Sequence, residues 1–391
     1  MFAPARHVLT FGWIVRVAMA LLWCAAVMVW DVVHRSGVGE RAQAVWPPGA
    51  PEVSVTLGPQ AQGQIPMPEN TPAAHASSLL AMPRGAPEGV LAFWFAGTKE
   101  SAPDIGIAAS GFDRSTQQWR AARFVVNRDA LGPLLGFGVR RLGNPVAWLD
   151  ADQKVHLFVV ATGLGGWAAS RVVHLRQSSA SSGVAALTFE PVRVLPLSWW
   201  WNTSFLVRTA PLPLKDGGMV LPIYFELGIK YPTALRFDAK GQLLGLVRMS
   251  QRTHVLQPTL LMQSPTQWLA LMRDQRPEGR IAVAQTKDGG EHWQDLPDLA
   301  LVNPDASVAG LGLASGQMLL AHNASAHSRA LLDLSQSANG RDWTSVQRLA
   351  QGTGAQEYSY PAMTWSDGSL WVSYTDQRKR IVWQRFGPTG H

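Results

Sequence analysis

The chain has 391 residues, of which 47% are hydrophobic and 16% are charged. This balance is typical of a globular protein and excludes a largely disordered chain. The formal net charge is +7, but the basic residues are scattered rather than gathered in a run, so nucleic-acid binding is not expected. A single cysteine, Cys24, excludes a disulfide framework within the chain.

The N-terminal residues contain a strongly apolar segment, Leu9–Trp30, interrupted only by Arg16. The segment from Leu9 to Val33 is long enough to span a bilayer, whereas its uncharged part has the length of a signal-peptide core. We expect residues 1–35 to form a cytoplasmic tip and an uncleaved transmembrane helix, with a cleaved signal segment as the alternative. The rest of the protein is then expected to be membrane-anchored and extracytoplasmic, which means periplasmic if the protein is bacterial.

Residues 36–71 are rich in Pro, Ala, Gly and Gln and lack hydrophobic periodicity, so a linker is predicted there. From residue 72 to residue 391, short apolar or alternating runs recur with turn signals between them, for example Val90–Phe95 and Val155–Val160. No long helix is expected in this part. Roughly 320 residues divided by six gives about 53 residues a unit, which suits the four-stranded blades of a propeller.

One octet, Thr286–Trp293, has the pattern Ser/Thr-x-Asp-x-Gly-x-x-Trp at every fixed position. Asp288 is expected to accept backbone N–H bonds within this turn, and a glycine can adopt the positive φ that the reversal needs. Trp293 is expected to be a large buried anchor. Degenerate copies occur at Asp113–Trp119 and Ser337–Trp343, the second with Ala338 at the position expected for the Asp.

This octet is similar to the Asp-box, or BNR repeat, of the sialidase (neuraminidase)-like superfamily, and the chain is identified as a member of it. The resemblance implies an all-β fold, a six-bladed β-propeller, preceded in this chain by one N-terminal transmembrane helix. It also implies a glycoside hydrolase of exo-α-sialidase type. In that family three arginines hold the carboxylate of the substrate, an Asp is the acid/base, and a Tyr activated by a Glu is the nucleophile. No metal or other cofactor is implied.

The resemblance assigns most of these roles to residues of this chain. Arg273 and Arg329 resemble the second and third arginines, and Asp104 lies where the acid/base is expected. Both arginines can instead be surface residues or salt-bridge residues between blades. The nucleophile is expected to be Tyr358 or Tyr360, which are predicted to share one face of a strand.

Two positions depart from the family pattern. His75 stands about where the first arginine is expected, and it would bind a carboxylate only when protonated. Gln257 stands where the activating Glu is expected, and a neutral amide cannot take the proton of the phenol. Glu226 is the candidate for a replacement base from another blade. An acidic glycan is therefore expected to bind more tightly below about pH 6.5, where His75 becomes charged.

Three consecutive tryptophans, Trp199 to Trp201, are predicted to lie on a strand with at least one exposed indole on which a sugar can stack. We therefore expect a sialidase-like glycoside hydrolase with an incomplete catalytic set, which acts on a carbohydrate or glycoconjugate, acidic sugars included. One alternative is a non-catalytic glycan- or protein-binding propeller. Another is a glycosidase or lyase whose site is rebuilt around His75, Asp104 and Glu226.

Overall fold

The computed structural model describes residues 6–35, 41–100, 102–181, 183–277 and 279–389. They belong to two compact units, Met1–Arg41 and Ala42–His391. The first unit contains one helix, α1 (Arg6–Arg35), which includes the apolar segment. Within the described residues no helix is both long and apolar enough to cross a membrane, so the predicted transmembrane helix is not supported.

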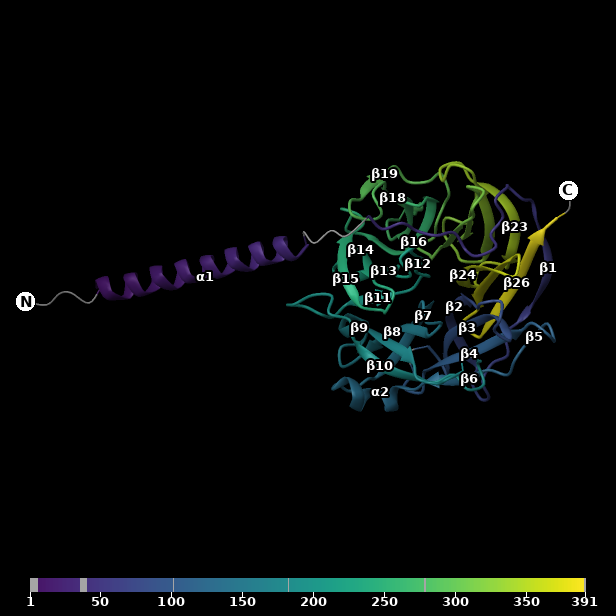
Figure 1. The fold of residues 1–391 in the computed structure, drawn as a ribbon, viewed down its shortest axis with the longest axis horizontal. Coiled ribbons are helices and arrows are strands. Elements are labelled where there is room, and N and C mark those ends of the chain that lie inside the picture. Colours follow the sequence, from purple (N-terminus) through teal and green to yellow (C-terminus); the bar gives the residue numbers. More distant parts are fainter. Residues whose placement is uncertain (1–5, 36–40, 101, 182, 278, 390–391) are drawn as a thin grey trace, which may run out of the picture. The chain divides into compact units, whose positions relative to one another are not determined.

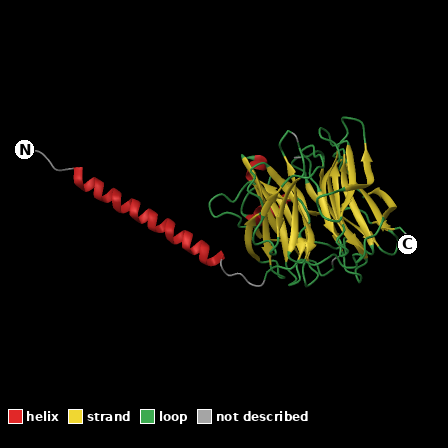
Figure 2. Ribbon diagram, turned by 90° about the horizontal axis from the view of Figure 1, so that it is seen from above, coloured by secondary structure: helices red, strands yellow, loops and turns green. Residues whose placement is uncertain are grey.

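The second unit consists of six antiparallel sheets arranged around a common centre, as Figure 1 shows. Figure 2 shows the strands running between two edges that carry the loops. Each sheet is a blade of four strands, and blades 1 and 3 carry one short extra strand each. The all-β, six-bladed propeller is therefore confirmed.

In the first three blades the strands follow one another from the centre of the propeller outward. Blade 1 consists of β2 (Ala73–Ala81), β3 (Glu88–Gly97), β4 (Gly106–Asp113), β5 (Gln118–Trp119) and β6 (Arg123–Val126). Blade 2 consists of β7 (Arg141–Leu149), β8 (Val155–Thr162), β9 (Ser170–Gln177) and β10 (Phe189–Val194). Blade 3 consists of β11 (Phe205–Val207), β12 (Leu212–Pro213), β13 (Met219–Leu227), β14 (Ile229–Phe237) and β15 (Leu243–Arg248).

The other three blades follow in the same order. Blade 4 consists of β16 (Val255–Ser264), β17 (Gln267–Asp274), β18 (Ala282–Thr286) and β19 (Gln294–Leu296). Blade 5 consists of β20 (Ala309–Gly312), β21 (Met318–Asn323), β22 (Leu331–Ser337) and β23 (Thr344–Gln351). Blade 6 consists of β24 (Tyr358–Ser366), β25 (Ser369–Asp376), β26 (Arg380–Pro388) and β1 (Leu57–Gln64). Two short helices, α2 (Arg128–Leu135) and η1 (Gly166–Ala169), lie in loops of blades 1 and 2.

The hydrophobic core is divided into six clusters, and each cluster fills the space between two neighbouring blades. Between blades 6 and 1, for example, the ring of Phe112 contacts the rings of Trp371 and Trp383 edge-on, with centroids 4.7 and 5.6 Å apart. Neighbouring blades cover both faces of each sheet. The second and third strands of blade 1, β3 and β4, are therefore buried at every position.

The ring is closed by the two ends of the second unit. β1 pairs with β26 as the outer strand of blade 6, although the other three strands of that blade come from the end of the chain. Before β1, Ala42 and Ala44 are buried in the cluster between blades 3 and 4. Residues 42–71 therefore belong to the folded unit, in contrast to the predicted linker, because strand pairing rather than hydrophobic alternation determines their place.

A residue with positive φ lies at or near the start of the inner strand of every blade. With φ between 42° and 67°, these residues are Ala76, Asn144, Ser204, Gln257, Asp305 and Tyr360. In β2, β7, β16 and β24 the strand register shifts at this point, which marks a β-bulge. A positive φ is unfavourable for residues other than glycine, and such residues concentrate at functional sites. The bulge also ends the regular alternation of side chains along the strand.

The predicted Asp-box turn connects β18 to β19 and is confirmed. Asp288 Oδ1 accepts hydrogen bonds from the backbone N–H groups of Glu291 and His292 at 3.1 and 3.0 Å. Gly290 has a φ of 91° and accepts a bond from the indole of Trp293 at 3.0 Å. Trp293 is only partly buried, at the edge of the cluster between blades 3 and 4, and not the fully buried anchor that we expected.

The turn Ser337–Trp343 uses an amide in place of the carboxylate. Asn339 Oδ1 accepts the backbone N–H groups of Arg341 and Asp342 at 2.8 and 2.9 Å. Asn339, not Ala338, therefore takes the role of the Asp, because the turn has one residue fewer between this side chain and the tryptophan.

Candidate functional site

Hydrogen bonds and ion pairs from five blades form a continuous chain around one end of the propeller, where the inner strands begin. Its members, in order from blade 3 to blade 1 and called the central arc below, are Tyr224, Gln257, Arg273, Asp305, Arg329, Glu357, Arg378 and Glu100. The side chains of Arg378 and Asp305 are 44% and 41% exposed, so a solute can reach the arc from the solvent.

The first half of the central arc is organised by Arg273, at the end of β17. Its Nη1 donates to Gln257 Oε1 at 3.2 Å, and its Nε pairs with Asp305 Oδ1 at 2.5 Å. Gln257 Nε2 in turn donates to the hydroxyl of Tyr224 at 3.2 Å. Burial alone would lower the pKa of Arg273, but the hydrogen bond to Asp305 and the electrostatic effects of Tyr360, Asp305 and Tyr224 together outweigh it and raise the pKa above the usual arginine value.

The second half is organised by Glu357, just before β24. Its Oε1 pairs with Arg329 Nη1 at 3.0 Å, and its Oε2 pairs with Arg378 Nε at 3.0 Å. Burial would raise the pKa of Glu357, but hydrogen bonds from Arg378 and Ser359 together lower it to about 2. Arg378 also pairs with Glu100. Three guanidinium groups of the arc therefore face three carboxylates, and the predicted carboxylate-binding arginines already have internal partners.

The two candidate nucleophiles point in different directions. The ring of Tyr358 lies edge-on to Tyr374 at 6.2 Å, beside the core cluster between blades 5 and 6. Tyr360 instead lies 4.4 Å from the ring of His75 and interacts electrostatically with Arg273. The prediction that both tyrosines share a face is wrong, because the bulge and the positive φ of Tyr360 reverse the alternation. Of the two candidate nucleophiles, Tyr360 is the one that lies beside the central arc.

His75 cannot serve as a carboxylate-binding cation near neutral pH. Its side chain is buried between the rings of Phe95 and Tyr360. Burial, assisted by the charge of Arg378, lowers the pKa of His75 to about 3. The expected tightening of glycan binding below pH 6.5 is therefore wrong as far as His75 is concerned, since this imidazole stays neutral at that pH.

The two candidate acids occupy different environments. Asp104 is exposed in the β3–β4 loop, where its carboxylate accepts bonds from the backbone N–H and the hydroxyl of Thr98, both at 3.0 Å. These contacts hold the loop and do not join Asp104 to the arc. Glu226, at the end of β13, is partly buried, and burial raises its pKa while the charge of Arg273 opposes the rise. Glu226 is thus the candidate acid in electrostatic contact with the arc.

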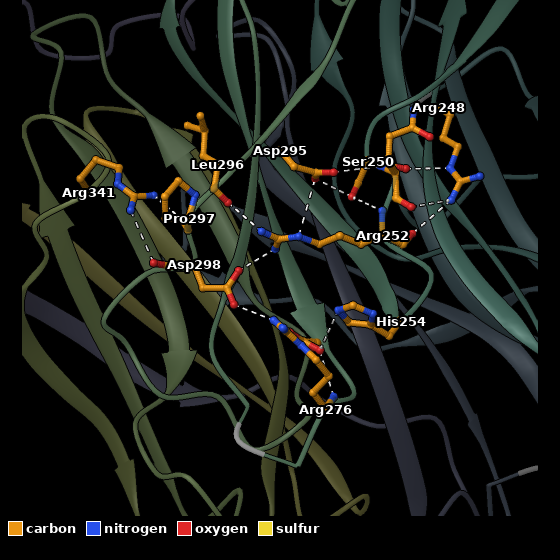
Figure 3. Close-up of polar contacts among 12 residues, drawn as sticks. Arg248, Ser250, Arg252, His254, Arg276, Asp295, Leu296, Pro297, Asp298 and Arg341 are labelled. Carbon is orange, nitrogen blue, oxygen red and sulfur yellow. Dashed lines mark hydrogen bonds and ion pairs between the residues drawn. The ribbon is translucent and has the colours of Figure 1, made fainter.

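A second polar network supports the end of β17 just outside the arc. Asp298 accepts bonds from Arg252 and Arg276, both at 2.6 Å, as Figure 3 shows. Arg276 also pairs at 2.5 Å with Asp274, the residue that follows Arg273. The β17–β18 loop is therefore tied to the end of β17 through Asp274 and to the loop after β19 through Asp298.

Sequence reasoning identified five residues that the structure brings to the arc or directly beside it, namely Gln257, Arg273, Arg329, Tyr360 and Glu226. It missed the other five members of the arc. These are the tyrosine Tyr224, the acids Asp305, Glu357 and Glu100, and the arginine Arg378. Only Glu357 had a local signal, because it directly precedes the candidate nucleophile segment.

The three tryptophans form an exposed loop between β10 and β11 rather than a strand. The side chains of Trp199, Trp200 and Trp201 are 88%, 79% and 51% exposed. The loop is held at its base, where Asn202 bonds the backbone of Leu195 and Leu197 at 2.9 Å. It connects an outer strand to the next inner strand, so it opens at the same end of the propeller as the central arc.

One group of possible metal ligands lies among the described residues. Ligand atoms of Asp288, Glu291 and His292 lie within 4.8 Å of one another on the Asp-box turn. The two oxygens of Asp288 already accept bonds from the turn and from the imidazole of His292. This arrangement is explained by the turn itself.

The blades, the Asp-box turn and the arc at one end of the central axis define a sialidase-like β-propeller. The sequence profile of the BNR repeat-like domain matches residues 88–372, and the chain belongs to that family. Comparison with the sequences of curated proteins finds no match.

Three solved structures illustrate the likeness of fold. The Hadza microbial sialidase Hz136 has a TM-score of 0.65 at 15% identity, over 82% of this chain and 66% of that chain. A mutant of Trypanosoma rangeli sialidase displaying trans-sialidase activity has a TM-score of 0.64 at 14% identity, over 88% and 59%. A protein of unknown function from Dyadobacter fermentans has a TM-score of 0.67 at 12% identity, over 85% and 99%. The chain thus spans less than two thirds of the length of these sialidases, and identities this low show the fold alone.

Proposed function

We propose that the protein binds a carbohydrate at the central arc and has little or no hydrolytic activity of the sialidase type. The observation that carries the proposal is the environment of Gln257. Its amide oxygen accepts a bond from Arg273 and its amide nitrogen donates to Tyr224, so both ends of the amide have a partner and neither is a base. A tyrosine nucleophile near neutral pH requires a neighbouring base to take its proton.

The pairing of the charges favours recognition of hydroxyl groups. Arg273 with Asp305, and Arg329 with Glu357, place hydrogen-bond donors beside acceptors. Neighbouring hydroxyls of a sugar can donate to one partner and accept from the other. An acidic sugar has to displace an internal carboxylate from its arginine before it can bind in the same place. Neutral and acidic sugars are therefore both candidate ligands, with neutral sugars favoured.

The exposed tryptophan loop supports a carbohydrate ligand. Ser204, at the end of this loop, accepts the backbone N–H of Glu226 at 2.9 Å, so the loop is attached next to an acid that interacts with the arc. An indole presents a flat apolar face of the kind that packs on the C–H face of a sugar ring. An oligosaccharide that reaches from the arc toward Trp201 would use both features.

A glycan-binding screen and a fluorogenic sialoside assay test the proposal together. Wild-type protein should retain specific glycans and should hydrolyse the sialoside at close to the background rate. Arg273→Ala should lose glycan binding, whereas Arg348→Ala should retain it, because Arg348 pairs with Asp333 in the outer strands of blade 5. A wild-type protein that retains no glycan, or retention unchanged by Arg273→Ala, would contradict binding at the arc.

A second candidate function, a glycoside hydrolase with a rebuilt site, is favoured by Glu226. Burial raises the pKa of Glu226, toward the protonated form that a general acid needs, whereas the pKa of Glu357 is held at about 2. Carboxyl groups in opposite protonation states are the usual requirement for glycoside hydrolysis. If the protein cleaves any glycoside, Glu226→Gln should reduce kcat by about 100-fold or more. Cleavage that survives this substitution would exclude Glu226 as the acid.

The extracytoplasmic location stays a prediction from the sequence. Alkaline phosphatase fused to the C-terminus and expressed in a bacterium would test it, because that enzyme becomes active only outside the cytoplasm. An inactive fusion of normal abundance would contradict the prediction.

A further inference from the structure

Arg208 is a buried cation at the centre of the propeller, directly after β11. Its side chain is only 2% exposed. Nη1 donates to the carbonyl of Ser77 at 3.2 Å and Nη2 to that of Pro361 at 2.9 Å, and the ring of Tyr360 lies 5.0 Å from Cζ. Among the described residues no acidic side chain forms an ion pair with Arg208, and its Nε–H has no acceptor.

This environment distinguishes Arg208 from the arginines of the central arc. A buried charge is costly unless an opposite charge and hydrogen bonds compensate it. Arg273 is compensated by Asp305, which raises the pKa of Arg273. Arg208 has only carbonyl oxygens and an aromatic face, and burial lowers its pKa to about 10. The guanidinium is still charged near neutral pH, so this part of the interior carries a net positive charge.

A small cavity adjoins Arg208 beneath the arc. Its volume is about 20 Å³, which is enough for one water-sized species. Five blades line it, and the polar side chains among its walls are Ser78, Arg208, Thr209 and Thr259. None of its lining residues is acidic. The hydroxyl of Ser78 is buried without a hydrogen-bond partner, so the cavity is flanked by two unused donors, Ser78 O–H and Arg208 Nε–H.

We propose that this cavity binds a small monovalent anion of the halide type, with chloride as the physiological ligand. The anion accepts hydrogen bonds from Arg208 and Ser78 and neutralises the buried guanidinium. A water molecule can satisfy the same donors, but it leaves the charge uncompensated. Sulfate, phosphate and sugar carboxylates are larger than the cavity. The site is separate from the carbohydrate site, because it lies below Tyr360 and uses no residue of the arc.

Halide-dependent stability of the full chain tests the proposal. Sodium gluconate is replaced stepwise by sodium chloride or sodium bromide at constant ionic strength, and the melting temperature is measured. Because a ligand that binds only the folded state stabilises it by mass action, wild-type protein should gain at least about 2 °C between 1 and 200 mM halide. Arg208→Gln should abolish this gain. Arg348→Gln should keep it, since the charge removed there is paired with Asp333.

Two further measurements decide the matter if Arg208→Gln does not fold. Ser78→Ala removes one of the two donors and should raise the halide concentration at half effect by about 3-fold to 10-fold. Crystals grown with sodium bromide should show an anomalous peak in contact with Arg208 Nε and Ser78 Oγ. The proposal is overturned if wild-type protein melts at the same temperature in gluconate, chloride and bromide, or if bromide crystals show no anomalous peak in the cavity.

Discussion

Gln257 accepts a hydrogen bond from Arg273, with 3.2 Å between Oε1 and Nη1. The guanidinium of Arg273 is thereby held between an amide and the carboxylate of Asp305. Both partners fix the orientation of the guanidinium, but only Asp305 carries a charge that neutralises it. Whether residue 257 is an amide or a carboxylate therefore decides if the phenol of Tyr224 has a base next to it.

Replacing Gln257 by Glu should introduce that base. A carboxylate at this position would lie beside Arg273, which keeps it ionised, and within reach of the Tyr224 hydroxyl. We expect the hydrolysis of a fluorogenic sialoside to rise by about 10-fold or more above the wild-type rate. The control is Gln263→Glu, which changes a side chain that bonds Gln285 elsewhere in blade 4. If both variants remain at the wild-type rate, the amide is not what limits hydrolysis.

Replacing Glu357 by Gln should free two arginines. Glu357 now occupies Arg329 and Arg378, so an anionic sugar competes with it for both guanidiniums. We expect Glu357→Gln to bind sialyllactose about 5-fold to 10-fold more tightly than wild type, measured by calorimetry. The exposed residue Glu190 provides a control, Glu190→Gln, with the same change in net charge. Equal affinity of the two variants would show that Glu357 does not compete with ligand.

The Asp-box turn should tolerate an amide better than a methyl group at position 288. Asp288→Ala leaves the N–H groups of Glu291 and His292 without an acceptor and should lower the free energy of unfolding by about 1–3 kcal/mol. Asp288→Asn should lose about half of that or less, because Asn339 already makes the equivalent bonds in blade 5. Urea unfolding of both variants distinguishes them. Equal losses would mean that the charge, rather than the acceptor oxygen, is required.

Stability should fall in mild acid because of buried histidines. Burial lowers the pKa values of His75 and His174 in the folded protein to about 3 each. The unfolded chain binds these protons near pH 6.5 and the folded chain does not, so stability falls as the pH drops from about 6.5 toward 3. Glu357 contributes a similar loss only below about pH 4.5, since its folded pKa is about 2.

Between pH 6.5 and 4.5 each of these histidines should contribute a loss of up to about 1.4 kcal/mol per pH unit. His75→Gln should make the pH dependence of urea unfolding correspondingly shallower in this range. His327→Gln, a change at an exposed histidine, serves as the control. An unchanged slope in His75→Gln would contradict the burial of a neutral imidazole at this position.

A chain that starts at residue 72 should be much less stable than one that starts at residue 42. The shorter chain lacks β1, which pairs with β26, and it lacks Ala42 and Ala44, which are buried between blades 3 and 4. Circular dichroism melts of the two chains compare them directly. We expect a cooperative transition in the longer chain and a lowered or broad transition in the shorter one. Coincident melts would mean that β1 is dispensable.

The fold could be predicted from the sequence because its signals are local. The bonds of the Asp-box lie within eight consecutive residues, from Thr286 to Trp293. The strand spacing repeats along the chain in the same way. β1 was not predicted from the sequence. Its pairing with β26 joins residues that lie far apart in the chain, such as Leu57 and Pro388, and no local pattern indicates such a pair.

The candidate site was predictable only in part, for the same reason. Arg273 and Gln257 were found through their spacing within one blade, whereas the carboxylate of Asp305 reaches Arg273 from 32 residues away in sequence. The choice between Tyr358 and Tyr360 depended on a positive φ, which the residue types around it do not indicate. The neutral state of His75 depends on burial and on the charge of Arg378, both of which are tertiary effects.

Blade 6 combines β1 with β24, β25 and β26, which come much later in the chain. This arrangement affects how the protein folds while it is being made. The ribosome produces β1 before the other strands of the propeller and β26 after them, so β1 has no partner strand until β26 has been made. Until β26 emerges, the aromatic rings of Phe112 and Trp371 cannot pack in the complete hydrophobic cluster between blades 6 and 1. Blade 6 can therefore be completed only after β26 has been made. A growing chain of this kind is open to strand mispairing until β26 emerges, and protection by chaperones is expected to matter more than it would for a fold that closes early.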